Sequence, residues 1–171
     1  LFALYSERTT RRRAFFVWFG LGWVSIPVFF WSVAMAPAVP VPGILDSVLA
    51  PLTFSSGLAA EARNTVQVAT LLAFFLGFAT LGPFSGYTVY FPELYPTRLR
   101  ATGCGICYNG GRFMAAAAPA LLGALTAHFA NQPGAVAGGL PMAATLVSCV
   151  YLLGFAGAFL APETKGKPLP E

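Results

Sequence analysis

Residues 65–92 read TVQVATLLAFFLGFATLGPFSGYTVYFP and contain no Asp, Glu, Lys or Arg. As an α-helix, this segment would be about 40 Å long, whereas the hydrocarbon core of a bilayer is roughly 30 Å thick. The segment therefore predicts a membrane-spanning helix that tilts, bends or protrudes. Gly82 and Pro83 mark the place where it can bend, because Pro lacks a backbone N–H.

The rest of the chain repeats this pattern. Only 9% of its 171 residues are charged, against about 25% in soluble domains. Charge-free stretches also run from Ala14 to Leu45 and from Phe113 to Pro162. With their flanking turn residues, these stretches predict further membrane helices at 14–35, 103–130 and 138–161. The expected fold is an all-α integral membrane protein with four transmembrane helices.

Polar or proline-rich segments connect these helices. Residues 1–13 are expected to form a basic loop, and residues 36–64 form a longer loop in which Ile44 to Phe54 could lie in the membrane interface as a short helix. The remaining connections and the tail are 93–102, 131–137 and 162–171.

The basic residues predict the orientation. With four crossings, both ends and the 93–102 loop share one side, which holds nine of the ten Lys and Arg residues, whereas the 36–64 loop holds only Arg63. Because cytoplasmic loops carry the excess of Lys and Arg, this side is predicted to be cytoplasmic, in a multi-pass protein of the cell membrane. The net charge of +4 is thus explained by topology, and no nucleic-acid partner is expected, because the basic residues do not follow one face.

The predicted spans contain little reactive chemistry. They hold no Asp, Glu or Lys, and their ionisable bases are Arg112 and His128. An isolated His near the end of a span lacks the partners of a proton relay or metal site. The chain has an odd number of cysteines, and all three lie in apolar sequence surroundings, namely Cys104, Cys107 and Cys149. This pattern favours a role in packing over a set of disulfides. No enzyme activity, catalytic residue, metal or cofactor is expected.

Arg112 lies about 13 Å into the span 103–130, measured along a regular helix. Its side chain leans toward the helix N-terminus and can reach the interface. Two interpretations stay open, namely an ion pair with Glu7, Glu93 or Glu163, and snorkelling without a specific partner.

The span 65–92 also carries polar side chains. Two interpretations stay open: these side chains line a solute pathway, or they have no role beyond helix packing. Gly82 and Gly86 would contribute to such packing, because they form a small-xxx-small pair that permits close approach of another helix. The candidate lining residues are Gln67, Thr70, Thr80, Ser85 and Tyr87.

Two motifs resemble the major facilitator superfamily of transporters. The run Phe91-Pro-Glu-Leu-Tyr-Pro-Thr-Arg-Leu-Arg-Ala-Thr-Gly103, followed by Gly111-Arg112 and Pro119, is similar to the region that joins spans 10 and 11 of these proteins. The ending Pro162-Glu-Thr-Lys-Gly-Lys-Pro-Leu-Pro-Glu171 resembles the segment after span 12 in the sugar-porter and organic-ion branches. Residues 3–12 are similar to the basic loop before span 9, with Ala3 and Thr10 at positions where the family pattern has Gly.

The resemblance implies that the chain supplies spans 9 to 12 of a twelve-helix bundle. The chain begins with Leu1 and is expected to be a piece of a longer one, whose N-terminal helices are its partners together with membrane lipid and a small-molecule substrate. The implied function is secondary transport of a small polar solute, such as a sugar, an organic acid or a related metabolite, by alternating access. Details of the motifs favour metabolite and organic-acid proton symporters, with the proton-binding group outside these spans.

The resemblance also implies an ion-pair network at the cytoplasmic helix ends, which closes in the outward-open state. A network worth about 1–3 kcal/mol would change a two-state ratio roughly 5- to 150-fold. Its predicted members are Glu7, Arg8, Arg11, Arg12, Glu93, Arg98, Arg100, Arg112, Glu163 and Lys165.

Two other classes of protein compete with a transporter. A self-contained four-span scaffold or small channel would pack its helices through Gly and Ala faces. About eight further apolar segments upstream in the reading frame would favour the transporter, and their absence would favour the scaffold. A membrane enzyme is disfavoured by the scarcity of acidic and His residues in the spans.

Overall fold

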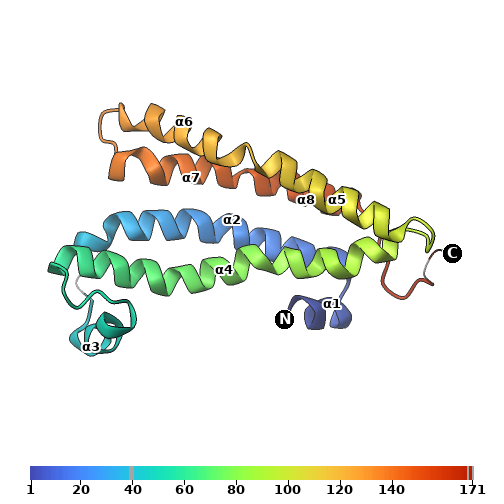
Figure 1. The fold of residues 1–171 in the computed structure, drawn as a ribbon, viewed down its shortest axis with the longest axis horizontal. Coiled ribbons are helices and arrows are strands. Elements are labelled where there is room, and N and C mark those ends of the chain that lie inside the picture. The colour runs from blue at the N-terminus through green and yellow to red at the C-terminus, as the bar shows by residue number, and fades with distance from the viewer. Residues whose placement is uncertain (39–40, 169, 171) are drawn as a thin grey trace.

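The computed structural model describes residues 1–38, 41–168 and 170, and these residues contain no strand. Four of its helical segments are long and apolar enough to cross a membrane. Figure 1 shows them as long rods lying side by side. The predicted all-α fold is thus confirmed. The four segments are Arg11–Ala38, Ala60–Leu94, Arg100–Ala130 and Ala137–Leu160.

The first segment consists of α2 (Arg11–Met35) and the 3-10 turn η1 (Ala36–Ala38). Thr10 caps α2, because its hydroxyl accepts a hydrogen bond from the backbone N–H of Arg13 at 3.2 Å. Its backbone is extended, with φ −134°, a conformation that does not require Gly. Before this cap, the region expected to be a loop contains the short helix α1 (Phe2–Arg8).

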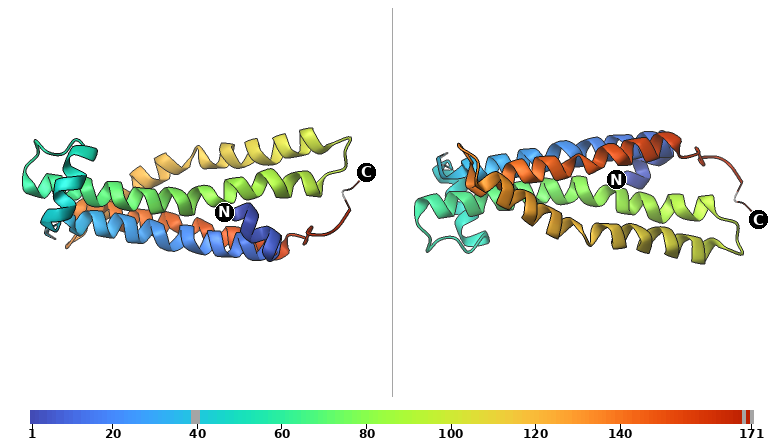
Figure 2. Two further views of the ribbon diagram at one scale, coloured as in Figure 1. Left: turned by 90° about the horizontal axis from the view of Figure 1, so that it is seen from below. Right: turned by 90° about the horizontal axis from the view of Figure 1, so that it is seen from above.

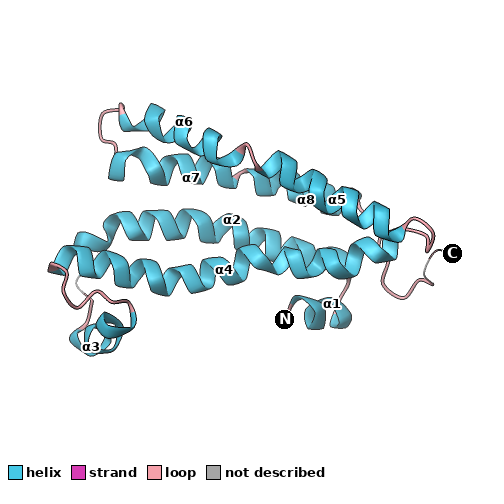
Figure 3. Ribbon diagram, in the orientation of Figure 1, coloured by secondary structure: helices cyan, strands magenta, loops and turns pink. Residues whose placement is uncertain are grey.

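The second segment is the single helix α4 (Ala60–Leu94), which is longer than the predicted span because it extends into both flanking regions. It remains helical through Pro83 and Pro92. The loop before it contains α3 (Gly43–Leu52), and Figure 3 shows how loops separate α3 from the long helices.

The third and fourth segments are each interrupted. Helices α5 (Arg100–Ala115) and α6 (Ala118–Ala130) are separated at residues 116–117. Pro119 explains this break, because it cannot donate a hydrogen bond to the carbonyl four residues earlier. The fourth segment comprises η2 (Ala137–Gly139), α7 (Leu140–Ser148) and α8 (Val150–Leu160).

Helix α2 packs against α4 on one side and against α7 and α8 on another, whereas α5 packs against α4 and α6 packs against α7. Figure 2 shows the α4–α5 and α2–α8 pairs diverging toward the C-terminal end. The buried core lies where α1, α2, α4 and α8 meet. It comprises Phe2, Ala14, Phe15, Trp18, Phe19, Tyr90 and Ala158.

Two glycines let α4 approach this core closely. A Cβ atom at Gly82 would overlap the indole of Trp18, and one at Gly86 would lie 2.5 Å from the ring of Phe2. The predicted role of the Gly82–Gly86 pair in close packing is therefore confirmed.

Large apolar side chains cover the outside of the bundle. Phe74 is 75% exposed, Phe113 82% and Leu160 82%. Apolar surface on this scale is unfavourable in water but suits contact with lipid or with other apolar helices.

Candidate functional site

Charged side chains from several elements meet at the end of the bundle where α2 begins and α4 ends. Arg11 lies at the centre, with its side chain only 8% exposed. Its Nη2 donates to Oε1 of Glu93 at 2.8 Å and its Nε donates to Oε2 at 3.3 Å. Its Nη1 donates to Oε1 of Glu7 and to Oγ of Ser6, both at 2.8 Å. One guanidinium thus connects α1, α2 and α4.

The segment after α8 joins the same cluster. The carboxylate of Glu163 accepts the backbone N–H groups of Arg11 at 3.0 Å and of Arg12 at 3.2 Å. These groups belong to the first turn of α2, where a helix leaves its N–H groups free for an anion. Thr164 donates its hydroxyl to Oε2 of Glu93 at 2.5 Å, and Lys165 donates Nζ to the carbonyl of Glu7 at 2.6 Å. We call this cluster the polar junction; its members are Ser6, Glu7, Arg11, Glu93, Glu163, Thr164 and Lys165.

Arg12 binds the C-terminal end of α8 beside the polar junction. Its guanidinium donates to the carbonyls of Ala158 and Phe159 at 3.3 Å and 2.5 Å. It also lies 5.5 Å from the centre of the Phe159 ring. A cation that binds the last carbonyls of a helix stabilises that end of the helix dipole.

The hydrogen bonds of Glu163 predict a pH dependence. Burial alone would raise its pKa, but donation from the backbone N–H groups of Arg12, Lys165 and Arg11 outweighs burial and lowers the pKa. Because the folded-state pKa lies below the unfolded value, this carboxylate stabilises the junction above the unfolded-state pKa, and the stabilisation is lost as pH falls through the folded-state pKa.

We therefore expect a fluorophore at Lys167→Cys to report release of the C-terminal segment only below the ordinary carboxyl pKa of 4.5. The substitution Glu163→Gln, which cannot ionise, should remove this part of the titration. An unchanged acid transition in Glu163→Gln would contradict the assignment.

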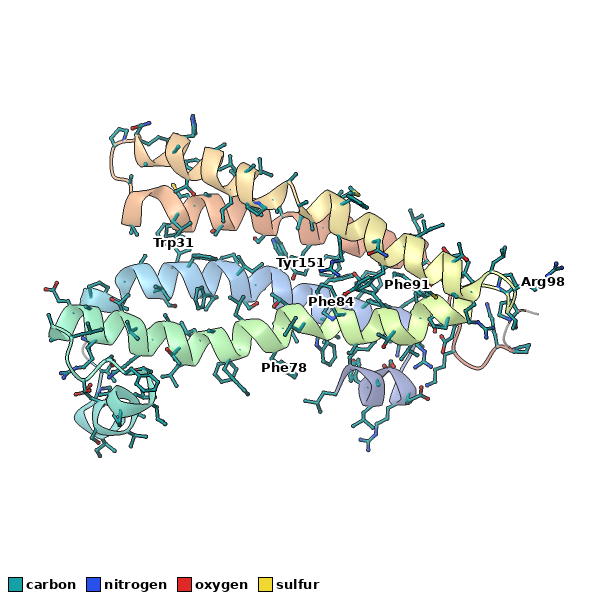
Figure 4. All side chains as sticks on the ribbon, viewed as in Figure 1. Trp31, Phe78, Phe84, Phe91, Arg98 and Tyr151 are labelled. Carbon is teal, nitrogen blue, oxygen red and sulfur yellow. The ribbon has the colours of Figure 1, made fainter. Side chains whose placement is uncertain are left out.

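The structure does not bring all the predicted network residues together. In the described part of the chain, the hydrogen bonds of Arg100 go to the carbonyls of Tyr95 and Pro170 and to the hydroxyl of Thr97. Arg8 is exposed, and Arg98 extends away from the bundle in Figure 4. Arg112 lies on α5 and is exposed.

Ser6 and Thr164 are members of the polar junction that sequence reasoning missed. Each is adjacent to a predicted carboxylate, Glu7 or Glu163. Their position next to these carboxylates was the sequence feature that could have identified them.

A cavity of about 330 Å³ lies between α4 and α5. The rings of Tyr87 and Phe91 stack in its wall with their centres 5.0 Å apart. The guanidinium of Arg112 lies 5.5 Å from the centre of the Tyr108 ring, and Figure 4 shows Phe84 and Phe91 pointing into the space between the two helices. The lining residues are Phe84, Tyr87, Phe91, Cys107, Tyr108, Gly111, Arg112 and Ala115. Arg112 is thus the charged group in an otherwise aromatic and apolar wall.

Of the five candidate lining residues, Tyr87 lines this cavity. Thr70, Thr80 and Ser85 donate their hydroxyls to carbonyls of their own helix, each at 2.8 Å. Gln67 is fully buried and donates to Oδ1 of Asp46 at 2.7 Å. Sequence reasoning missed Phe84, although it precedes Tyr87 and Phe91 by three and seven residues, the spacing of one helix face.

Comparison with known proteins adds an independent line of evidence. The chain is 32% identical over 105 residues to the protein named "Probable 4-methylmuconolactone transporter" of Cupriavidus pinatubonensis, a match that covers 60% of this chain and 22% of the relative. It is 40% identical over 88 residues to human solute carrier family 22 member 10, covering 52% and 14%. It is 35% identical over 109 residues to low affinity inorganic phosphate transporter 8 of Medicago truncatula, covering 63% and 19%. No family model and no solved structure matches the chain.

These relatives are transporters rather than enzymes, and the matched region corresponds to about a fifth or less of each one's length. They confirm the relationship to the major facilitator superfamily predicted from the motifs. With its four span-length apolar helices, the chain is a multi-pass membrane protein.

Proposed function

From this relationship to the major facilitator superfamily, we propose that the chain forms one part of a secondary active transporter. The transporter moves a small polar solute, such as a sugar, an organic acid or a related metabolite, by alternating access and with proton coupling. Further helices of the same polypeptide complete the bundle, which agrees with the small share of the relatives that this chain spans.

The polar junction is the observation that carries this proposal. Alternating access requires contacts that hold helix ends together in one state and release them in the other. Arg11 and Glu163 connect the end of α1 and the start of α2 to the end of α4 and to the segment after α8, through groups that water can reach once the helices separate. A contact of this type can be strong enough to bias a conformational equilibrium and weak enough to open.

We further propose that the polar junction lies on the cytoplasmic side. Residues 1–13, 93–102 and 162–171 are then cytoplasmic, and residues 36–64 and 131–137 lie on the opposite face. The distribution of Lys and Arg supports this orientation.

The cavity between α4 and α5 supports the proposal that the solute is an anion of the proposed class. Its aromatic wall suits an organic body, and Arg112 supplies a fixed positive charge. A guanidinium in such surroundings binds carboxylate or phosphate oxygens through charge-assisted hydrogen bonds. We propose Arg112 as the group that orients the anion.

Replacing Arg112 with Met in the complete transporter is expected to raise the KM for an organic anion about 10- to 150-fold, because a hydrogen bond to a charged group contributes roughly 1.5–3 kcal/mol. Arg112→Lys should fall between Met and the wild type. Arg98→Met is the matched control, since Arg98 lies outside the cavity, and it should leave the KM unchanged. Equal KM values for Arg112→Met and Arg98→Met would contradict the role of Arg112.

Reconstitution in proteoliposomes tests the proposed function itself. A transporter gives saturable uptake of a labelled organic anion that a proton gradient drives, whereas a channel gives non-saturating flux and a scaffold gives none. Saturable, gradient-driven uptake is the expected result, and either of the other outcomes would overturn the proposal.

A further inference from the structure

The connection between α2 and α4 is unusually poor in charge. Residues 36–59 contain a single charged side chain, that of Asp46, whereas about a quarter of the residues in a soluble domain are charged. Helix α3 forms the middle of this connection. Figures 1 and 2 show it beside the bundle, at the end opposite the polar junction.

One face of α3 is fixed to α4. Oδ1 of Asp46 accepts a hydrogen bond from Nε2 of Gln67 at 2.7 Å and pairs with Nε of Arg63 at 3.1 Å. Leu49 and Ala50, which follow Asp46 at helical spacing, are 8% and 7% exposed. The single charge of the connection is thus turned toward protein, and it holds α3 in one orientation.

The opposite face of α3 is an apolar stripe without a partner in the described residues. Ile44, Val48 and Leu52 follow one another at intervals of four residues and are 84%, 55% and 70% exposed, and Leu45 beside them is 47% exposed. At 100° per residue, these positions lie on the side of the helix away from Asp46 and Ala50.

Phe54 extends the stripe beyond the end of α3. The N–H of Ser55 donates to the carbonyl of Ala50 at 3.0 Å, and the N–H of Phe54 donates to that of Pro51 at 3.4 Å. This pattern is the helix ending in which Gly normally occupies the left-handed position. Phe54 occupies that position here, with φ 53°, and its side chain is 93% exposed. A large, exposed apolar ring therefore occupies a position where the backbone conformation favours Gly.

We propose that this stripe, composed of Ile44, Leu45, Val48, Leu52 and Phe54, anchors α3 in the interfacial layer of the membrane through the acyl chains of uncharged lipids. Helix α3 connects two segments that are long and apolar enough to cross a membrane, and it lies beside one end of the bundle, where the hydrocarbon layer would end (Figure 1). The stripe contains no Lys or Arg to attract anionic headgroups, so the contact is apolar. This inference does not depend on transport activity.

Site-directed fluorescence in phosphatidylcholine vesicles tests the anchor. A polarity-sensitive dye is attached to single cysteines at Leu52 or Phe54, in a background that lacks Cys104, Cys107 and Cys149. We expect blue-shifted emission, strong quenching by lipids with a nitroxide near the headgroup, and protection from iodide in water. The control positions Ser47 and Ser56 are exposed but lie off the stripe, and they should show the reverse.

Two other results would overturn the proposal. Access of iodide to Leu52 and Phe54 would show a loop in water, and protection from both iodide and lipid nitroxides would show that protein covers the stripe. Adding phosphatidylserine or 1 M salt should leave the quenching unchanged, because an apolar contact does not depend on ionic strength; a strong salt dependence would contradict the choice of uncharged lipid.

A pair of substitutions at Phe54 separates anchoring from folding. Phe54→Gly removes the ring but suits the left-handed backbone, so α3 should remain folded while lipid quenching of a dye at Leu52 falls severalfold. Phe54→Leu keeps an apolar side chain and should retain most of the quenching. Equal quenching in both variants would exclude Phe54 from the anchor.

Discussion

The substitution Glu93→Ala is expected to shift the complete transporter toward the inward-open state and to slow uptake. It leaves Arg11 buried with Glu7 as its remaining ion-pair partner. Breaking a fully buried pair costs roughly 3–5 kcal/mol, and because Glu7 remains we expect about 2–3 kcal/mol. A change of this size alters the ratio of the two states about 30- to 150-fold.

The shift can be measured at a native thiol. Cys107 lines the cavity between α4 and α5, so in a variant that lacks Cys104 and Cys149 its reaction with an impermeant maleimide reports opening from the side of the polar junction. Glu93→Ala should accelerate this reaction, and Glu93→Gln, which keeps hydrogen-bond capacity, should have a smaller effect.

Glu61→Ala is the matched control for Glu93→Ala. Glu61 is exposed in the first turn of the same helix, at the end far from the polar junction. Its removal should leave uptake and labelling at Cys107 unchanged. If Glu93→Ala and Glu61→Ala behave alike, the polar junction has no role in gating.

The second large effect is expected from Gly82→Ala, which adds one methyl group. The new Cβ would overlap the indole of Trp18, a side chain in the buried core that is 6% exposed and cannot move aside freely. Overpacking of this kind costs about 1–3 kcal/mol, and we expect the upper part of this range. The thermal unfolding midpoint of the detergent-solubilised protein should fall accordingly.

Gly77→Ala isolates packing from helix propensity. Gly77 lies on the same helix, and nothing is within 4 Å of the position that its Cβ would take. Because Ala favours a helix over Gly by about 1 kcal/mol, this variant should unfold at the same or a higher temperature. Adding Trp18→Leu to Gly82→Ala should recover part of the lost stability; a Gly82→Ala protein as stable as Gly77→Ala would contradict the packing of α2 on α4.

The sequence predicted the membrane helices because hydrophobicity accumulates along each one. The charge-free run before Pro92 was sufficient to identify α4, and the arginines before α2 marked its start. The break between α5 and α6 was not predicted, although Pro119 was visible. Helix α4 continues through Pro83, whereas the helix near Pro119 is interrupted. Whether a helix continues through a proline depends on contacts with its neighbours, which the local sequence does not contain.

The polar junction was also only partly predictable from the sequence, because it depends on contacts between helices. The motifs identified Arg11, Glu93 and Glu163 as charged residues at helix ends, but the pairing depends on how α2, α4 and α8 pack in three dimensions. Arg112 was grouped with them because it lies near the same side of the membrane, whereas the structure places it in the cavity between α4 and α5. Gln67 was a candidate lining residue of a solute pathway because it is polar within a span, and the structure pairs it with Asp46 of α3.

The most direct test is the sidedness of two engineered cysteines in intact cells, introduced singly at Gln132 and Lys167 in a background without native cysteines. Both positions are exposed, and they lie in the turn between α6 and α7 and in the C-terminal tail. If the four helices cross the membrane with the polar junction inside, an impermeant maleimide labels Gln132→Cys in intact cells and labels Lys167→Cys only after permeabilisation. Labelling of both cysteines from the same side would contradict the crossing pattern, and with it the orientation and the proposed gate.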